Sequence, residues 1–168
     1  MKFSCEKLLL QSAVATASRA VAAKSTIPAL EGVLLQTGNQ LTVSGYNMQT
    51  GIRTTLEADI TEEGALVLPA RLFGEIIRRL PDDVVTFYSD KGMNVQLTCG
   101  DAAYNITALS AEDYPELPEV EDQYSLRIQQ QTLRSMIGET SFAVSADEAR
   151  PIHTGSLFEI SEEGLTVV

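Results

Sequence analysis

The chain has 168 residues, 44% of them hydrophobic, and its 12 Lys and Arg against 23 Asp and Glu give a formal net charge of −11. The apolar fraction excludes an intrinsically disordered chain. The acidic balance argues against a nucleic-acid binder held by its overall charge, because such domains usually carry a basic surplus. A local basic surface on a protein of negative net charge is still possible.

The N-terminal segment has only a superficial likeness to a secretory signal. Its apolar run, Leu8–Leu10, stops at Gln11, whereas a signal needs about 7–15 apolar residues. Nowhere do five apolar residues run together, so no membrane span is predicted. We therefore expect a cytoplasmic protein in which both cysteines, Cys5 and Cys99, are reduced, buried thiols.

The first 58 residues predict a strand, a helix and three more strands. Phe3–Glu6 alternates between apolar and polar residues, as a strand does. The apolar residues then change to helical spacing, which predicts an amphipathic helix over Lys7–Ala22. Three strands are predicted to follow, over Gly32–Thr37, Gln40–Tyr46 and Ile52–Ala58.

The same order then repeats. A short strand over Ala65–Leu68 leads to Pro69, which suits a helix start because the missing N–H needs no partner there. The predicted buried stripe of this helix is Leu72, Phe73, Ile76, Ile77 and Leu80. Three more strands are predicted over Val84–Ser89, Met93–Thr98 and Ala103–Leu109. Residues 1–110 therefore predict an α+β fold of two tandem β-α-β-β-β units.

Residues 111–123 differ in composition from what precedes them. They contain six acidic residues, two prolines and no basic residue, which predicts a solvated, extended linker. The alternative is an acidic metal-binding loop. It is disfavoured because the prolines stiffen the segment and the spacing of a Ca²⁺ loop is absent.

After this segment the first unit begins again, at an offset of 123 residues. Pro28 then falls on Pro151, and the apolar register also matches, with a third helix predicted over Gln129–Val144. Its residues at helical spacing are Leu133, Met136, Ile137 and Thr140. Chance similarity of two α+β units is the alternative. Because the chain reaches Val168 within a predicted strand, we expect a fragment of a longer protein.

The segments that carry a resemblance to a known family are Met1–Ser4, Lys24–Leu30, Leu68–Arg71 and Leu109–Pro115. Together they resemble the bacterial DNA sliding clamps, the beta subunits of DNA polymerase III, and the similarity extends along the whole chain. In that family, three similar domains of two units each form a chain, and two chains close into a ring around duplex DNA. The resemblance implies the DNA-clamp fold, with helices lining one face and antiparallel sheets outside. It also implies clamp domain 1 over residues 1–118 and the incomplete start of domain 2 over residues 119–168.

The function that this resemblance implies is that of a processivity factor in DNA replication, a non-catalytic ring that tethers the polymerase to DNA. The implied partners are double-stranded DNA of any sequence, DNA polymerase III subunits, the clamp loader, other clamp-binding peptides and a second copy of the chain. No cofactor, metal or membrane is expected. A sliding ring needs a diffuse positive lining, whereas its outer surface is free to be acidic. The segments Cys5–Lys24 and Ala70–Leu80 fit that lining, because each carries three cations against one acid.

Two cations match family positions that contact DNA, Lys24 and Arg71. For Lys24 the alternative is a cation that stabilises the C-terminal end of the first helix. Arg78 lies about two turns beyond Arg71 on the same helix face, and a solvated surface role is equally open for it. Arg79 and Arg134 are weaker candidates.

The loop at residues 145–152 is the repeat counterpart of the Lys24 loop. Family positions that approach DNA match Asp147, Pro151 and Ile152 there. These residues suit the role poorly, because an Asp repels phosphate and the side chains of Pro and Ile donate no hydrogen bond. Arg150 is the nearby cation that could substitute.

Two protein interfaces are also implied by the resemblance. Tyr104 and Ile106 match apolar positions on the edge strand that pairs with the partner chain when the ring closes. Packing within their own domain is the alternative. His153 matches part of the wall of the groove that takes clamp-binding peptides, and the rest of that groove is not expected in this chain.

Two other functions compete with the clamp. An enzyme is disfavoured, because the sole histidine, His153, has Asp147 and Ser156 nearby but no known catalytic or metal-binding motif around it. No catalytic residue is therefore predicted. The alternative function is an acidic protein-interaction scaffold that does not bind DNA. A clamp requires Lys24, Arg71 and Arg78 to face one surface, whereas a scaffold does not.

Overall fold

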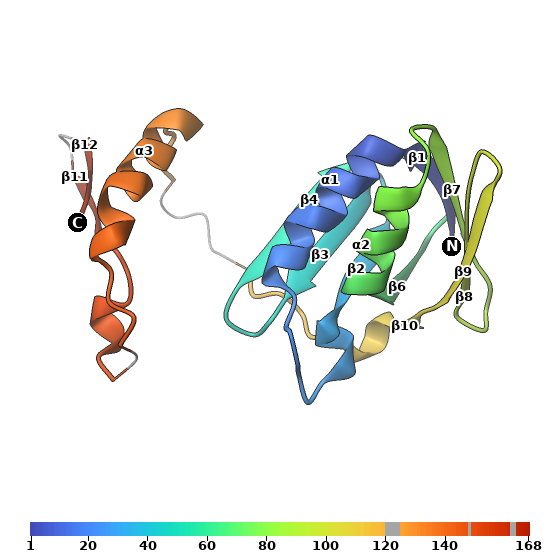
Figure 1. Cartoon of the computed structure of the whole chain (residues 1–168), viewed down its shortest axis with the longest axis horizontal. Coiled ribbons are helices and arrows are strands. Elements are labelled where there is room, and N and C mark those ends of the chain that lie inside the picture. Colours follow the sequence, from blue (N-terminus) through green and yellow to red (C-terminus); the bar gives the residue numbers. More distant parts are fainter. Residues whose placement is uncertain (120–124, 148, 162–163) are drawn as a thin grey trace. The chain divides into compact units, whose positions relative to one another are not determined.

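The computed structural model describes residues 1–119, 125–147, 149–161 and 164–168. The chain divides into two compact parts, here called the N-terminal module (Met1–Glu119) and the C-terminal module (Val120–Val168) (Figure 1). Each module is described by itself.

The helices of the N-terminal module are α1 (Lys7–Ala17) and α2 (Ala70–Arg79). Its strands are β1 (Lys2–Glu6), β2 (Gly32–Thr37), β3 (Leu41–Tyr46), β4 (Gly51–Leu56), β5 (Asp59–Glu62), β6 (Gly64–Pro69), β7 (Val84–Ser89), β8 (Asn94–Cys99), β9 (Ala102–Thr107) and β10 (Leu109–Ser110). The order confirms the predicted α+β fold of two tandem units. Each unit also has a further strand, β5 or β10, that the sequence pattern did not predict.

The strands form two five-stranded sheets in the described chain, in the orders β5-β1-β7-β8-β9 and β10-β6-β2-β3-β4. Every pairing within them is antiparallel. The first strand of each unit lies in the sheet of the other unit, because β1 pairs with β7 and β6 pairs with β2. The two units are therefore interleaved, and neither sheet is complete without both.

Strand β5 was missed because its sequence is mostly polar and charged, with Ile60 as its apolar residue. It forms because β1 offers an open edge, on which Phe3 is opposite Ile60 and Lys2 is opposite Glu62. Cross-strand pairing of this kind stabilises strands that have little intrinsic preference for the extended state.

One apolar core joins both sheets to both helices. Phe3 and Phe87 stack across the β1–β7 pairing, with ring centroids 4.7 Å apart, and Phe73 of α2 is fully buried beside them in the same core. Burying a side chain of this size stabilises a fold by about 1.5–3 kcal/mol. The place where the two units interleave is therefore part of this common core.

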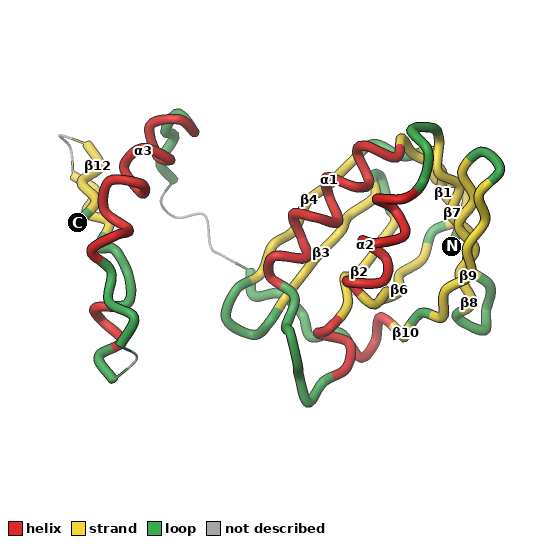
Figure 2. The backbone as a smooth tube through the Cα atoms, viewed as in Figure 1, coloured by secondary structure: helices red, strands yellow, loops and turns green. Residues whose placement is uncertain are grey.

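The two helices lie side by side on one face of the sheets (Figure 2). As predicted, α1 buries Leu10, Val14 and Ala17, but the helix ends at Ala17 and a 3₁₀ turn follows, so its predicted extent to Ala22 was wrong. In α2, Phe73, Ile76 and Ile77 are buried, and Leu80 directly after the helix is buried too. Leu72 is 48% exposed, which corrects the predicted stripe. It lies about 100° around the helix from Phe73, outside the buried arc.

The segment after β10 corrects the linker prediction. Tyr114 is 6% exposed and belongs to a second apolar cluster on the outer face of the β2 sheet, against which Leu117 also packs. Burial raises the pKa of the Tyr114 phenol to about 12, against a smaller lowering by the Tyr46 backbone. Residues 111–119 therefore cover part of the sheet, and residues 120–123 of the predicted linker lie outside the described residues.

The C-terminal module contains α3 (Gln130–Thr140) and a two-stranded antiparallel sheet of β11 (Phe158–Ser161) and β12 (Gly164–Val167). Residues 125–129, the repeat counterpart of β1, lie outside any helix or strand. Helix α3 has no buried residue, so the predicted stripe is in the right place but does not face a closed core.

Candidate nucleic-acid interface

The outward face of α1 carries no charge. Its exposed residues within the helix are Leu8, Leu9, Ser12, Ala15 and Thr16. The helix was expected to contribute Lys7 to a positive lining, but Lys7 is 8% exposed and its Nζ donates to Asp82 Oδ1 at 2.7 Å. This ion pair ties the first turn of α1 to the loop after α2. Lys7 is therefore largely buried and its charge is already paired within the protein.

Helix α2 supplies the densest positive charge of the helical layer. Arg71, Arg78 and Arg79 are all exposed. Arg78 and Arg79 lie in the last turn, where the helix dipole favours cations, whereas Arg71 lies in the first turn, where the dipole disfavours them. Glu75 offsets this, because its Oε1 accepts from Arg71 Nε at 3.3 Å.

Lys24 lies in the loop between α1 and β2 and is exposed. Glu31 Oε1 accepts from Ser25 N at 3.0 Å and Ser25 Oγ accepts from Ile27 N at 3.1 Å. These hydrogen bonds fix the part of the loop that directly follows Lys24. Because α1 ends at Ala17 and the following 3₁₀ turn at Ala20, Lys24 does not stabilise the helix end. This removes the alternative role that the sequence left open.

The two helices run in opposite directions. Lys7 N donates to Asp83 O at 3.1 Å, which places the start of α1 beside the end of α2. The end of α1, from which the Lys24 loop leaves, and the start of α2, which carries Arg71, lie toward the other end of the layer (Figure 1). Arg78 and Arg79 lie at the Lys7 end. The structure therefore distributes the exposed cations along the helical layer.

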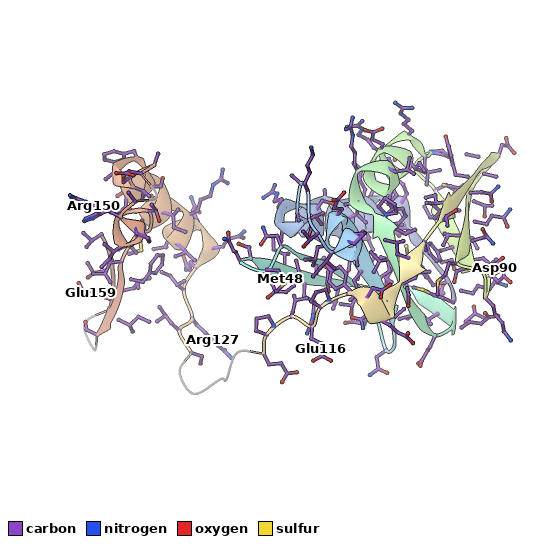
Figure 3. All side chains as sticks on the ribbon, turned by 90° about the horizontal axis from the view of Figure 1, so that it is seen from below. Met48, Asp90, Glu116, Arg127, Arg150 and Glu159 are labelled. Carbon is purple, nitrogen blue, oxygen red and sulfur yellow. The ribbon has the colours of Figure 1, made fainter. Side chains whose placement is uncertain are left out.

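In the C-terminal module, the candidate residues of the 145–152 loop are all exposed. Arg150 projects outward (Figure 3). Asp147 has a structural role, because its Oδ1 accepts from Ala149 N at 3.0 Å. Pro151 begins a 3₁₀ turn that also contains Ile152. Of this loop, Arg150 is the residue whose side chain could meet a phosphate.

His153 ends the same 3₁₀ turn and is exposed. It lines a hollow of about 590 Å³ together with Ile152, Leu157 and Val168. Its backbone is held on both sides, because His153 N donates to Arg150 O at 3.0 Å and its carbonyl accepts from Ser145 N at 2.8 Å. The imidazole thus stands at the rim of a partly apolar hollow.

Strand β9 is an edge strand of its sheet. Tyr104 lies opposite Leu97, and Ile106 lies opposite Val95, on the face that points into the module's own core. Ile106 is buried there and Tyr104 packs against the core while remaining partly exposed. In this chain the side chains thus pack within their own module, whereas the backbone edge of β9 has no strand beside it among the described residues.

The two thiols are buried, as predicted. Burial raises the pKa of Cys5 to about 12 and also raises that of Cys99, whose Sγ lies 3.4 Å from Pro81 O. Neither is a thiolate at neutral pH, so neither is a ready nucleophile. Among the residues that the structure describes, His, Cys, Asp and Glu nowhere gather in threes that could hold a metal ion. No helix in the described ranges is long and apolar enough to cross a membrane.

Residues 1–118 match the family model for the N-terminal domain of the DNA polymerase III beta subunit. The chain belongs to this family. Its beta sliding clamp relatives include that of Synechococcus elongatus, 33% identical over 98% of this chain, and that of Bacillus subtilis, 31% identical over 98% of it.

Solved structures of this family have a similar fold. The sliding clamp of Bacillus subtilis matches 99% of this chain with a TM-score of 0.93 at 30% identity, and the beta subunit of Streptococcus pyogenes matches 96% with a TM-score of 0.89 at 33% identity. These matches take up 46% and 44% of those two chains. The present chain likewise covers 45% of the S. elongatus clamp and 46% of the B. subtilis clamp. It therefore spans less than half the length of these relatives.

Sequence reasoning missed two features of this candidate surface. It counted Lys7 as a lining cation, because nothing in the local pattern shows that Asp82, 75 residues away, lies next to it. It counted Glu75 as a charge without recognising it as the partner of Arg71. Here a signal was present, since Arg71 and Glu75 are four residues apart on a predicted helix, the spacing at which opposite charges pair.

Proposed function

We propose that this chain is part of a DNA sliding clamp, the processivity factor that encircles duplex DNA and tethers the replicative polymerase to it. The observation that carries the proposal is the placement of charge. In a chain of net charge −11, exposed cations lie along a helical layer whose α1 face is otherwise uncharged. Such a surface attracts phosphates and reads no base sequence. Membership of the beta subunit family supports the same function.

In this proposal Lys24, Arg71 and Arg78 contact the phosphate backbone, with Arg79 as a weaker contact. Each is exposed on the helical layer or on the loop that leaves it. Arg150 takes the corresponding role in the C-terminal module. Asp147, Pro151 and Ile152 lie beside it without a charge that favours phosphate. The contribution is electrostatic, so it does not depend on base sequence.

The remaining parts of the clamp follow from the same assignment. Residues 1–118 form its first domain and residues 119–168 begin its second. The open edge of β9 pairs with a second copy when the ring closes, with Tyr104 and Ile106 on that strand. The hollow beside His153 is one wall of the groove for clamp-binding peptides of the polymerase and the clamp loader. The protein is non-catalytic and acts in the cytoplasm.

Retention on DNA tests the encircling mechanism. The longer protein, at the length of the relatives, is loaded onto circular duplex DNA and then the circle is cut. A clamp stays on the circle and leaves the linear form by sliding off its ends. Equal retention on both forms contradicts the proposal.

Duplex binding by the present chain tests the proposed contacts directly. Without encirclement, a few phosphate contacts supply weak binding that falls steeply with salt. We expect Arg71→Ala and Arg78→Ala each to weaken DNA binding at low salt. Each should also make the salt dependence of the affinity less steep, by roughly the amount that one phosphate contact contributes. An acidic scaffold that does not bind DNA predicts no binding in the wild type and no effect of either variant.

A further inference from the structure

An acidic side chain interrupts the cationic face of α2. Across α1 and α2, both described in full, Glu75 is the acidic residue among their 21 positions, 11 in α1 and 10 in α2. Residues three and four apart share a helix face. Glu75 therefore neighbours Arg71 on one side and Arg78 and Arg79 on the other, in the middle of the arginine row.

The contact with Arg71 is direct. Arg71 Nε donates to Glu75 Oε1 at 3.3 Å, and the Arg71 side chain as a whole is 94% exposed. An exposed pair of this kind contributes little to folding. It does compete with phosphate, because the carboxylate takes the Nε donor of the guanidinium and partly neutralises its charge. The pair therefore affects anion binding more than stability.

We propose that Glu75 is a built-in brake on DNA binding, an inference that rests on the proposed function of the α2 face. Its carboxylate occupies Arg71 and lowers the positive potential beside Arg78 and Arg79. Non-specific affinity is set by the number of phosphates that a protein neutralises. Glu75 lowers that number at the densest group of cations on the helical layer, which leaves the protein attracted to the duplex backbone without being held at one position.

A purely structural role for Glu75 makes a different prediction. Arg71 lies in the first turn of α2, near the positive end of the helix dipole. If Glu75 served only to offset that unfavourable placement, its loss would lower the stability of the helix and leave DNA affinity unchanged. Binding and stability must therefore be measured on the same variants.

The central variant is Glu75→Gln, which removes the charge and keeps the shape. The chain is titrated with a fluorescent duplex of arbitrary sequence at several salt concentrations below physiological ionic strength. We expect binding that is about two- to fivefold tighter, with a steeper salt dependence. The matched control is Glu63→Gln, which removes an exposed carboxylate from the turn between β5 and β6. Its effect is expected to stay below about 1.5-fold, because Glu63 lies on neither helix of the layer and no ion pair with an arginine is recorded for it among the described residues.

Arg71→Ala separates the brake from a general gain in positive charge. In the Arg71→Ala variant, Glu75→Gln is expected to raise DNA affinity less than it does in the wild type, because the arginine that Glu75 contacts is absent. Thermal unfolding checks that each variant is folded, and Glu75→Ala serves as a second charge-removing variant.

Equal gains from Glu75→Gln and Glu63→Gln overturn the brake while leaving DNA binding by the helical layer intact. No gain from Glu75→Gln, together with a loss of stability, overturns it in favour of the structural role. Binding that responds neither to Arg71→Ala nor to Glu75→Gln contradicts both the brake and the proposed function.

Discussion

The same residue pattern folds differently at two places in this chain. Leu10 and Val14 of α1 are fully buried, whereas their counterparts 123 residues later, Leu133 and Ile137 of α3, are not, and Ile137 is 44% exposed. Helix length does not explain the difference, because α1 and α3 both have 11 residues. What differs is the sheet on which each helix packs.

In the N-terminal module, each unit receives a strand from the other. Strand β1 pairs with β7, and β6 pairs with β2, so α1 and α2 pack on sheets to which both units contribute. In the C-terminal module, the described sheet has two strands, and residues 125–129 add none. In the N-terminal module the core is therefore closed by two interleaved units, whereas the described part of the C-terminal module brings one helix against two strands.

The largest expected effect comes from the interleaved strands themselves. Phe87→Ala removes a fully buried ring that stacks on Phe3 across the β1–β7 pairing. We expect the N-terminal module to lose about 3–5 kcal/mol of unfolding free energy, as a measurement by urea denaturation would show. Ile137→Ala in α3 is the control, with an expected loss of less than about 1 kcal/mol. Similar losses in both variants would contradict the contrast between the modules.

Glycines at matching repeat positions provide a second test. A Cβ at Gly32 would meet Val67 Cγ1 and would lie 2.7 Å from Leu68 O, whereas a Cβ at Gly155 would meet nothing within 4 Å. Because Gly32 faces backbone across the β2–β6 pairing, Gly32→Ala is expected to cost about 1–3 kcal/mol. Gly155→Ala is expected to change stability by less than about 0.5 kcal/mol. The melting temperatures of the two variants test this difference. Equal changes in Gly32→Ala and Gly155→Ala would contradict it.

A smaller effect is expected at the Lys7–Asp82 pair. Asp82→Asn removes the anion from a cation that is largely buried, so we expect a loss of about 1–2 kcal/mol in denaturant unfolding. The repeat counterpart of Lys7 is Gln130, which is exposed, and Gln130→Ala should be close to neutral. A neutral Asp82→Asn would mean that the pair does not hold the start of α1.

The smallest expected effect is a loss of folding stability that appears only at alkaline pH. Burial raises the pKa of Cys5 from 9.0 to about 12 and that of Tyr114 from 10.0 to about 12. The unfolded chain ionises first, so these groups leave stability unchanged below about pH 9 and lower it as the pH rises towards 12. Cys5→Ala should weaken this decline in denaturation experiments across that range. A decline of the same steepness in the variant would show that Cys5 does not contribute.

Much of the N-terminal module could be predicted because local pattern and final structure agree there. The strands at Gly32–Thr37 and Val84–Ser89 have the predicted bounds. Both bury apolar residues in the main core, Val33 and Leu35 from the first strand and Val85 and Phe87 from the second. Strand β5 could not be predicted, because its formation depends on the open edge of β1. Tyr114 was placed in a solvated linker, because six acidic residues nearby in the sequence outweighed one aromatic ring that the sheet buries.

The candidate site divides in the same way. The presence of Arg71, Arg78 and Glu75 on one helix follows from helical spacing, and the structure places them as that spacing requires. The loss of Lys7 from the exposed surface does not follow from spacing, because the residue that binds it comes from the loop after α2. The alternative role of Lys24, a cation at the end of the first helix, does not apply because α1 ends at Ala17, before the apolar pattern does.

The amino-acid sequence was enough to predict the order of the main helices and strands, the repeat, the family resemblance and the concentration of positive charge in two helical segments, because each is visible in runs of neighbouring residues. The three-dimensional structure was needed to show that the two units exchange their first strands, that Lys7 is paired and buried, and that Tyr114 covers a sheet. These depend on contacts between distant segments, whose partners a local pattern does not specify. Placement, rather than the total of −11, is therefore what supports a DNA-binding surface on an acidic protein.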